Sequence, residues 1–301
     1  VGKMDTEVKI NTKAVKEPGA SVKKAAGIYS QDKAMKIINK YTRHPDNRKG
    51  TSLNYYVERA GFSGQTTNLA GMNPDTLTQM AKGLDDVLGR YNINVDWIGY
   101  HMKGMAPRKA SGAAWEWGGS NVHALTFQKT YTKNWKSMHK KGNANYILKK
   151  QNQIKNSKYW VDYYEKQLAQ ASTPSNARNA KRMLDKYRNQ LSIYSNKNVN
   201  RWTVGDDFYS TVVHESWHQV DYQLSKTMGL GKRRLRHIFQ DKLDELGVIR
   251  NDWYEVSEYA GDSIAELWAE TGTALVTNSR VPQKIKKAFI QTLEEVGQTY
   301  P

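Results

Sequence analysis

The pentapeptide His214-Glu215-Ser216-Trp217-His218 decides how the rest of this chain is interpreted. A helix advances about 100° per residue, so His214 and His218 lie one turn apart and present their imidazoles on one face. Two histidines in this arrangement can bind one zinc ion from a single rigid element. Glu215 lies beside them, where its carboxylate can take a proton from a zinc-bound water. The pentapeptide therefore indicates a metal-dependent hydrolase.

The flanking residues favour a packed helix over the alternative of two solvated histidines on a surface helix. No Pro or Gly interrupts residues 208–224. This segment places five apolar residues in one arc beside the histidines, namely Tyr209, Val213, Trp217, Val220 and Leu224. A helix with such an arc buries it against a core. We therefore expect a helix over 208–224 with its histidine edge at the border of the core.

A third metal ligand is expected from a second helix further along the chain. No histidine follows His218 closely, because the next one is His237. Residues 262–276 are predicted to form a helix, on which Glu266 and Glu270 lie one turn apart on one face. Either carboxylate can supply the third ligand of a zinc site.

The second helix resembles that of a known family when it is paired with the first. The sequence from Tyr259 continues Tyr-Ala and then Glu-x-x-Ala-Glu, with Tyr259 seven residues before Glu266. Together with the His-Glu-x-x-His helix, this resembles the gluzincin-type metallopeptidases related to anthrax lethal factor, including phage-encoded relatives. The resemblance implies that Glu266 completes a Zn²⁺ site, that Glu270 supports it without binding the metal, and that Tyr259 stabilises the oxyanion. It covers the two helices, extends over 74–127 only by layout, and does not reach the rest.

Structural alternatives compete with the roles of the two glutamates. Ser263-Ile264-Ala265-Glu266 also fits a helix capping box, in which Glu266 reaches back to the backbone N–H of Ser263. In that case Glu270 is the metal ligand. Both possibilities remain open, although the family pattern favours Glu266.

Three further residues near the motifs have alternative roles. With 18 Tyr in the chain, Tyr259 can equally be a packing or surface residue. Asp221 and Gln219 follow His218 closely and can orient an imidazole from behind the metal ligands. An ordinary surface role competes for both.

Residues 73–127 are predicted to form the sheet-containing part of a zincin-like domain. Asn73 and Pro74 suit the N-cap and first position of a helix that ends near Tyr91. Polar and apolar residues then alternate over 92–100, which predicts a strand buried on one face.

A hairpin is predicted from two short strands at 113–117 and 121–127, which flank the turn Gly118-Gly119-Ser120-Asn121. In zincin-like folds the edge strand holds an extended peptide by backbone pairing. By this analogy we expect the second strand of the hairpin to be the edge strand. The residues expected to position the substrate are Val122, Ala124 and Thr126.

The whole chain has a net charge of +17, and its basic residues are concentrated in one part of it. Residues 129–201 hold 17 Lys or Arg against 3 Asp or Glu, whereas residues 202–301 hold 11 against 15. Aromatic residues are interleaved with these lysines at Trp135, Tyr146, Tyr159, Trp160, Tyr163, Tyr164, Tyr187 and Tyr194. Lysines with aromatics suit phosphate contacts and base stacking.

The basic segment is predicted to be a helical hairpin inserted into the catalytic domain. Its helices are expected over 156–171 and 175–195, joined by Ser172-Thr173-Pro174. A solvated pair of helices accounts for the charge, and so does a docking surface for nucleic acid, an acidic protein or another anionic surface. The charge indicates where a partner docks but not which partner.

The predicted organisation is α+β, with a basic N-terminal extension over 1–72 that contains short helices. A zincin-like catalytic domain follows over 73–301 and is interrupted by the insertion at 129–201. The absence of Cys excludes disulfides and thiolate metal sites. No apolar run of about 18 residues exists, so no membrane span is expected. The sequence predicts a soluble protein and is compatible with a virion-associated or a secreted one.

The sequence as a whole predicts a zinc-dependent endopeptidase with Glu215 as general base. No G-x-S-x-G elbow, phosphate-binding glycine loop or dinucleotide fingerprint supports another enzyme class. Two alternatives remain. One is a basic structural or nucleic-acid-associated protein, such as a phage virion component, whose peptidase-like domain is inactive or secondary. The other is a secreted toxin or effector that cleaves one host protein.

Overall fold

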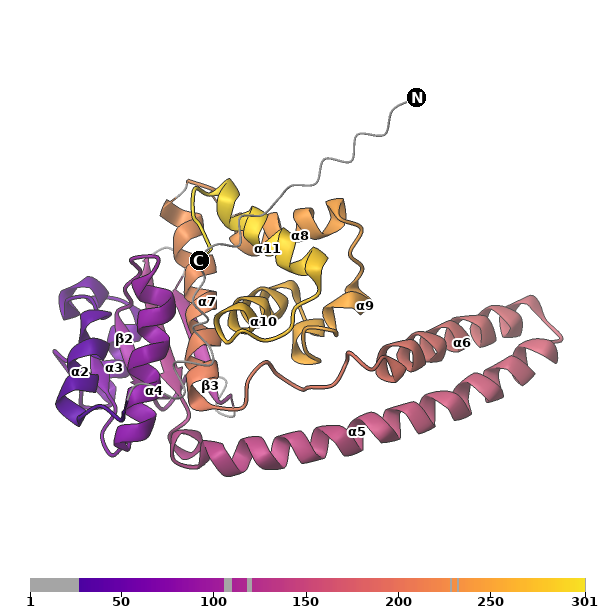
Figure 1. The fold of residues 1–301 in the computed structure, drawn as a ribbon, viewed down its shortest axis with the longest axis horizontal. Coiled ribbons are helices and arrows are strands. Elements are labelled where there is room, and N and C mark those ends of the chain that lie inside the picture. The colour runs from indigo at the N-terminus through magenta and orange to yellow at the C-terminus, as the bar shows by residue number, and fades with distance from the viewer. Residues whose placement is uncertain (1–26, 106–109, 118–120, 228, 232, 301) are drawn as a thin grey trace.

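The computed structural model describes residues 27–105, 110–117, 121–227, 229–231 and 233–300. Its architecture is α+β, with a small mixed sheet among helices and a long helical hairpin that projects from the body (Figure 1). Most of the arm expected at the N-terminus lies outside the described residues. Among the helices that are described, none combines the length and the apolar character needed to cross a membrane.

The described part of the N-terminal region packs against the rest of the fold and contributes to its hydrophobic core. Its elements are α2 (Gln31–Lys40), the 3₁₀ helix η1 (Pro45–Arg48), α3 (Ser52–Arg59) and β1 (Thr67–Asn68). Ala34 and Ile38 of α2 are fully buried. The described residues before 73 thus contain short helices, and β1 pairs with the central sheet, while the domain boundary at residue 72 stays a prediction.

The described sheet has four strands in the order β1-β2-β4-β3. The strands that follow β1 are β2 (Trp97–Tyr100), β3 (Gly112–Trp117) and β4 (Val122–Phe127). β2 runs parallel to both β1 and β4. β3 and β4 are antiparallel neighbours, which confirms the predicted hairpin.

Both faces of the sheet are covered, so the prediction that 92–100 is a strand buried on one face is wrong. On one face Trp97 packs with Leu53 and Val57 of α3. On the other face Ile98 and Leu125 belong to the main core, to which the helices α4 (Pro74–Leu84) and α7 (Phe208–Thr227) contribute. All four residues of β2 are buried for this reason.

The edge strand next to α7 is β3. β4 pairs with β2 on one side and with β3 on the other, so its backbone hydrogen-bonding groups are occupied by neighbouring strands. The prediction that the second strand of the hairpin is the edge strand is therefore wrong, and a peptide cannot pair with it. This correction applies to Val122, Ala124 and Thr126, which are buried inside the sheet.

α4 begins as its sequence predicts. Asn73 caps it by accepting a hydrogen bond from the backbone N–H of Thr76 at 2.8 Å, and Pro74 occupies the first turn. The helix continues into a π-helical turn, η2 (Asp85–Gly89), before Tyr91.

The basic segment forms a longer hairpin than predicted. α5 (Lys129–Ala169) is a single helix of 41 residues, and α6 (Pro174–Ser195) packs against its distal half (Figure 1). The first helix therefore begins at Lys129 and not near Asn156. The segment before residue 156 contains no Pro and a single Gly142, so nothing in the chain ends the helix there.

The C-terminal part packs several helices around α7. These are α8 (Leu235–Glu245), α9 (Arg250–Trp253), the 3₁₀ helix η3 (Tyr259–Gly261), α10 (Ile264–Val276) and α11 (Gln283–Glu295). The two helices predicted to carry metal ligands are confirmed as α7 and α10, and they pack directly on each other.

A glycine allows α7 and α10 to approach closely. A Cβ atom at Gly272 of α10 would lie 2.5 Å from the indole of Trp217 on α7. The indole N–H of Trp268 donates to the backbone carbonyl of Trp217 at 2.9 Å, and Phe289 stacks on Trp268. This contact fixes the separation of the helices that carry His214 and Glu266.

We expect Gly272→Ala to destabilise the fold by about 1–3 kcal/mol, because the added methyl overpacks the contact with Trp217. The matched control is Gly142→Ala in α5, where an added Cβ meets nothing within 4 Å. This substitution should stabilise the chain by about 0.5–1 kcal/mol, since Ala favours helix more than Gly does. Urea unfolding measures both changes, and a Gly272→Ala variant as stable as the parent would contradict the packing described here.

Candidate metal centre

His214, His218 and Glu266 converge where α7 meets α10, and each offers one ligand atom to a common site. The Nε2 atoms of the two histidines lie 3.2 Å apart. Oε2 of Glu266 lies 3.1 Å from Nε2 of His214 and 3.5 Å from Nε2 of His218. Three donors that face one another at these separations can hold a metal ion.

Glu266 reaches the histidines, although Ser263 caps its helix and so forms one half of the capping box that the sequence allowed. Ser263 caps α10 by accepting a hydrogen bond from the backbone N–H of Glu266 at 3.2 Å. The Glu266 carboxylate is directed toward the imidazoles and not back to Ser263. Burial acts to raise the pKa of Glu266, but hydrogen bonds to His214 and His218 outweigh it and hold that pKa below its usual value. The carboxylate is therefore ionised, as a metal ligand must be.

Glu270 lies behind His214, away from the other two donors. Its Oε1 contacts Nδ1 of His214 at 2.8 Å. Its Oε2 accepts from the backbone N–H of Val204 and from the hydroxyl of Ser257, both at 2.6 Å. A carboxylate that is hydrogen-bonded to Nδ1 fixes the orientation of the imidazole and leaves Nε2 as the ring nitrogen that can bind a metal. Glu270 therefore orients the imidazole of His214, and its three partners leave it outside the donor cluster.

The other residues expected behind the ligands have different partners. Asp221 accepts from the backbone N–H of Arg236 at 3.1 Å and forms an ion pair with its guanidinium at 3.2 Å. Nδ1 of His218 is buried and has no hydrogen-bond partner among the described residues. Gln219 ties α7 to the sheet, since its side-chain amide donates to the backbone carbonyls of Trp115 and Ala124. The structure thus gives Asp221 and Gln219 roles in packing α7.

Glu215 is held against the start of the edge strand. Burial raises its pKa, with the neighbouring histidines opposing, and the backbone N–H of Ala114 in β3 hydrogen-bonds to its carboxylate. A Cβ atom at Gly112 would lie 2.9 Å from Cγ of Glu215, so only glycine leaves room for this approach. Gly112 and Ala114 were not predicted from the sequence as part of this site. The one available signal was a glycine just before a predicted strand.

Tyr259 lies beside the donor cluster, at the start of η3. Its ring centroid is 5.8 Å from that of His214. Burial, followed by the charges of Glu266 and Glu215, raises the pKa of Tyr259 far above its usual value. The phenol therefore keeps its proton and can act as a hydrogen-bond donor.

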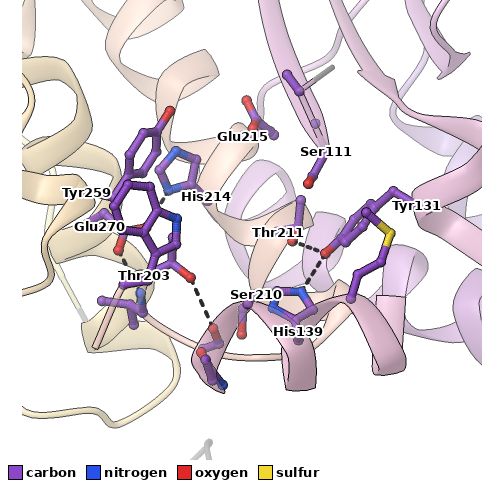
Figure 2. A pocket seen from close by; sticks show the side chains of 18 residues that line it. Ser111, Tyr131, His139, Thr203, Ser210, Thr211, His214, Glu215, Tyr259 and Glu270 are labelled. Atoms are coloured by element: carbon purple, nitrogen blue, oxygen red, sulfur yellow. Dashed lines mark hydrogen bonds and ion pairs between the residues drawn. The ribbon is translucent and has the colours of Figure 1, made fainter. Parts of the chain in front are cut away.

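A cavity of about 320 Å³ opens next to these groups, and Figure 2 shows the side chains that line it. Its wall includes His214, Glu215 and Tyr259 on one side. The opposite wall comes from the first turns of α5, where the hydroxyl of Tyr131 contacts Nε2 of His139 at 2.7 Å and the hydroxyl of Thr211 at 2.6 Å. Thus the basic hairpin contributes its base to the cavity, a role that its sequence did not indicate.

The middle of α5 also contacts the segment that carries Tyr259. Lys149 of α5 forms an ion pair at 2.8 Å with Glu258, which is only 5% exposed. The Lys149 ammonium lies 4.9 Å from the ring centre of Trp202, and that ring lies 6.1 Å from the ring of Tyr259. These contacts position Tyr259 from the side opposite α10.

No protein-family model matches this chain, and neither a curated protein nor a solved structure matches it. The chemistry of the site therefore follows from its side chains alone. They supply three side chains that could hold a metal ion, one carboxylate with a raised pKa, and one protonated phenol beside one cavity.

Substitution separates the roles of the two glutamates on α10. We expect Glu266→Gln to lose most of the bound metal, because an amide oxygen is a poorer ligand than a carboxylate. Glu270→Gln should keep one metal per chain but bind it about 10–100-fold more weakly, as removal of a group that orients a ligand does. Metal analysis with competition by a chelator measures both. If the Glu270→Gln variant lost its bound metal and the Glu266→Gln variant kept one metal per chain, Glu270 and not Glu266 would be the ligand.

Proposed function

We propose that this chain is a zinc-dependent endopeptidase with a gluzincin-type site. The observation that carries this proposal is the convergence of His214, His218 and Glu266, with Glu215 next to them on α7. The sequence predicts the two histidines and Glu215 from their spacing on one helix, and the family resemblance favours Glu266 as the third ligand.

The separations of the donor atoms support zinc as the metal. Zinc binds histidine nitrogen and carboxylate oxygen at about 2.0–2.2 Å, usually as a tetrahedron, so that two ligand atoms lie about 3.3 Å apart. The three separations here are 3.1, 3.2 and 3.5 Å. Two imidazoles and one carboxylate are also the donor set of many catalytic zinc sites, which keep a fourth position open.

Bound zinc would polarise the scissile carbonyl and make a water molecule more acidic. Glu215 is placed to take the proton of the attacking water, and its raised pKa suits a general base that later returns the proton to the leaving amine. Tyr259 keeps its phenolic proton and can donate it in a hydrogen bond to the oxyanion. Glu270 holds the imidazole of His214 in place throughout.

We assign the positioning of an extended substrate to β3. This strand pairs only with β4 among the described strands, so its other edge can accept a peptide strand. Its first residue, Gly112, touches Glu215, which places the start of this edge next to the proposed base. The adjoining cavity can receive a substrate side chain.

We expect Glu215→Gln to retain one zinc per chain and to lose peptide cleavage by a factor of about 10²–10⁴, the usual contribution of a general base. Cleavage of a peptide library, followed by mass spectrometry, gives the activity. Glu294→Gln on α11, an exposed glutamate outside the site, makes the same chemical change and should leave cleavage intact. A Glu215→Gln variant that cleaves at the parent rate would rule out this base.

Tyr259→Phe removes only the hydroxyl. If this group stabilises the oxyanion, kcat should fall by about 10²–10³-fold with little change in KM. Tyr163→Phe on the hairpin is the matched control, since that tyrosine is 41% exposed and does not line the cavity. Steady-state kinetics on one cleaved peptide distinguish the outcomes, and an unchanged kcat would leave Tyr259 with a packing role only.

A further inference from the structure

We propose that the outward face of α5, which carries Lys141, Lys155 and Lys166, binds single-stranded nucleic acid. This inference concerns a surface remote from the donor cluster and does not depend on the proposed peptidase activity. It is drawn from how the cations and aromatic rings of the hairpin are distributed.

Two lysines at the middle of α5 are used within the protein. Lys149 pairs with Glu258, and Lys150 donates to the backbone carbonyls of Asn196 and Val199. These two side chains anchor the hairpin and are not available to a ligand.

The lysines of the outward face have no such partners. Lys141, Lys155 and Lys166 are exposed and form no ion pair or hydrogen bond with the described residues. At about 100° per residue, these three positions fall within a sector of roughly 40° on the helix. They extend over about 38 Å of helix length, at 1.5 Å per residue. A straight row of unpaired cations of this length suits a polyanion whose charges are regularly spaced.

Exposed aromatic rings accompany the lysines. Tyr159 lies in the same sector and is 62% exposed, and Tyr163 follows one turn later at 41%. Both rings contact Trp160, at centroid distances of 5.1 Å for Tyr159 and 5.5 Å for Tyr163, and Trp160 in turn stacks on Tyr187 of α6 at 5.7 Å. Rigidly held aromatic side chains among cations are the arrangement on which unpaired bases stack.

The tyrosines favour a single strand over other anionic partners. An acidic protein or an anionic lipid surface would use the same lysines, but neither carries a flat ring beside each of its charges, as a single strand does. A base-paired duplex presents its phosphates but hides the faces of its bases. The distal half of α5 projects from the body together with α6 (Figure 1).

The test is the binding of a fluorescent thirty-residue oligothymidylate to the full chain at several salt concentrations. The triple substitution Lys141→Gln, Lys155→Gln, Lys166→Gln should weaken binding at least tenfold. It should also flatten the plot of log affinity against log salt by about 2, since each phosphate contact with a single strand contributes about 0.7. The control is Lys284→Gln, Lys286→Gln, Lys287→Gln on α11, which removes three exposed lysines elsewhere. This control should bind like the parent.

Tyr159→Ala tests the stacking separately. It should weaken the oligothymidylate roughly 5–100-fold, as loss of one stacked base does, and affect a duplex far less. Tyr55→Ala on α3 is the control, since that tyrosine is 57% exposed but lies outside the hairpin. Circular dichroism checks that each variant is folded. The proposal is overturned if the parent does not bind, if both triple variants lose binding equally, or if polyglutamate or anionic lipid vesicles compete as well as the oligonucleotide.

Discussion

The contact between α7 and α10 is the constraint on which the candidate site depends. Gly272 admits the indole of Trp217 to the surface of α10. Because the helices are this close, Glu266 reaches the two histidines from across the interface. Glu270, one turn further along α10, reaches the back of His214 through the same contact. The donor cluster is therefore a consequence of how two helices pack, and not of either helix alone.

Much of this site could be predicted from sequence because its signals are local. The spacing of His214 and His218 fixes a shared face on any helix. The spacing of Glu266 and Glu270 does the same on the second helix, but it does not decide which carboxylate faces the metal. That choice needed the packing of α10, which turns Glu266 toward the imidazoles and closes Glu270 in with Val204 and Ser257.

Prediction from sequence was wrong or incomplete where a residue's role depends on contacts with residues distant in the chain. Whether β4 or β3 is the edge strand is decided by pairing with β2, which the hairpin pattern does not contain. The role of α5 depends on tertiary contacts as well, since Tyr131 and Lys149 meet residues more than 70 positions away. Its lysine-rich composition indicated a solvated or docking surface. The structure shows both a wall of the cavity at the base of α5 and exposed lysines along its distal half.

The most direct test of the central claim is anomalous X-ray diffraction at the zinc absorption edge, from crystals of this chain grown with zinc. We expect one anomalous peak within about 2.0–2.2 Å of Nε2 of His214, Nε2 of His218 and a carboxylate oxygen of Glu266. A peak that contacts Glu270 in place of Glu266, or no peak between the two histidines, would contradict it.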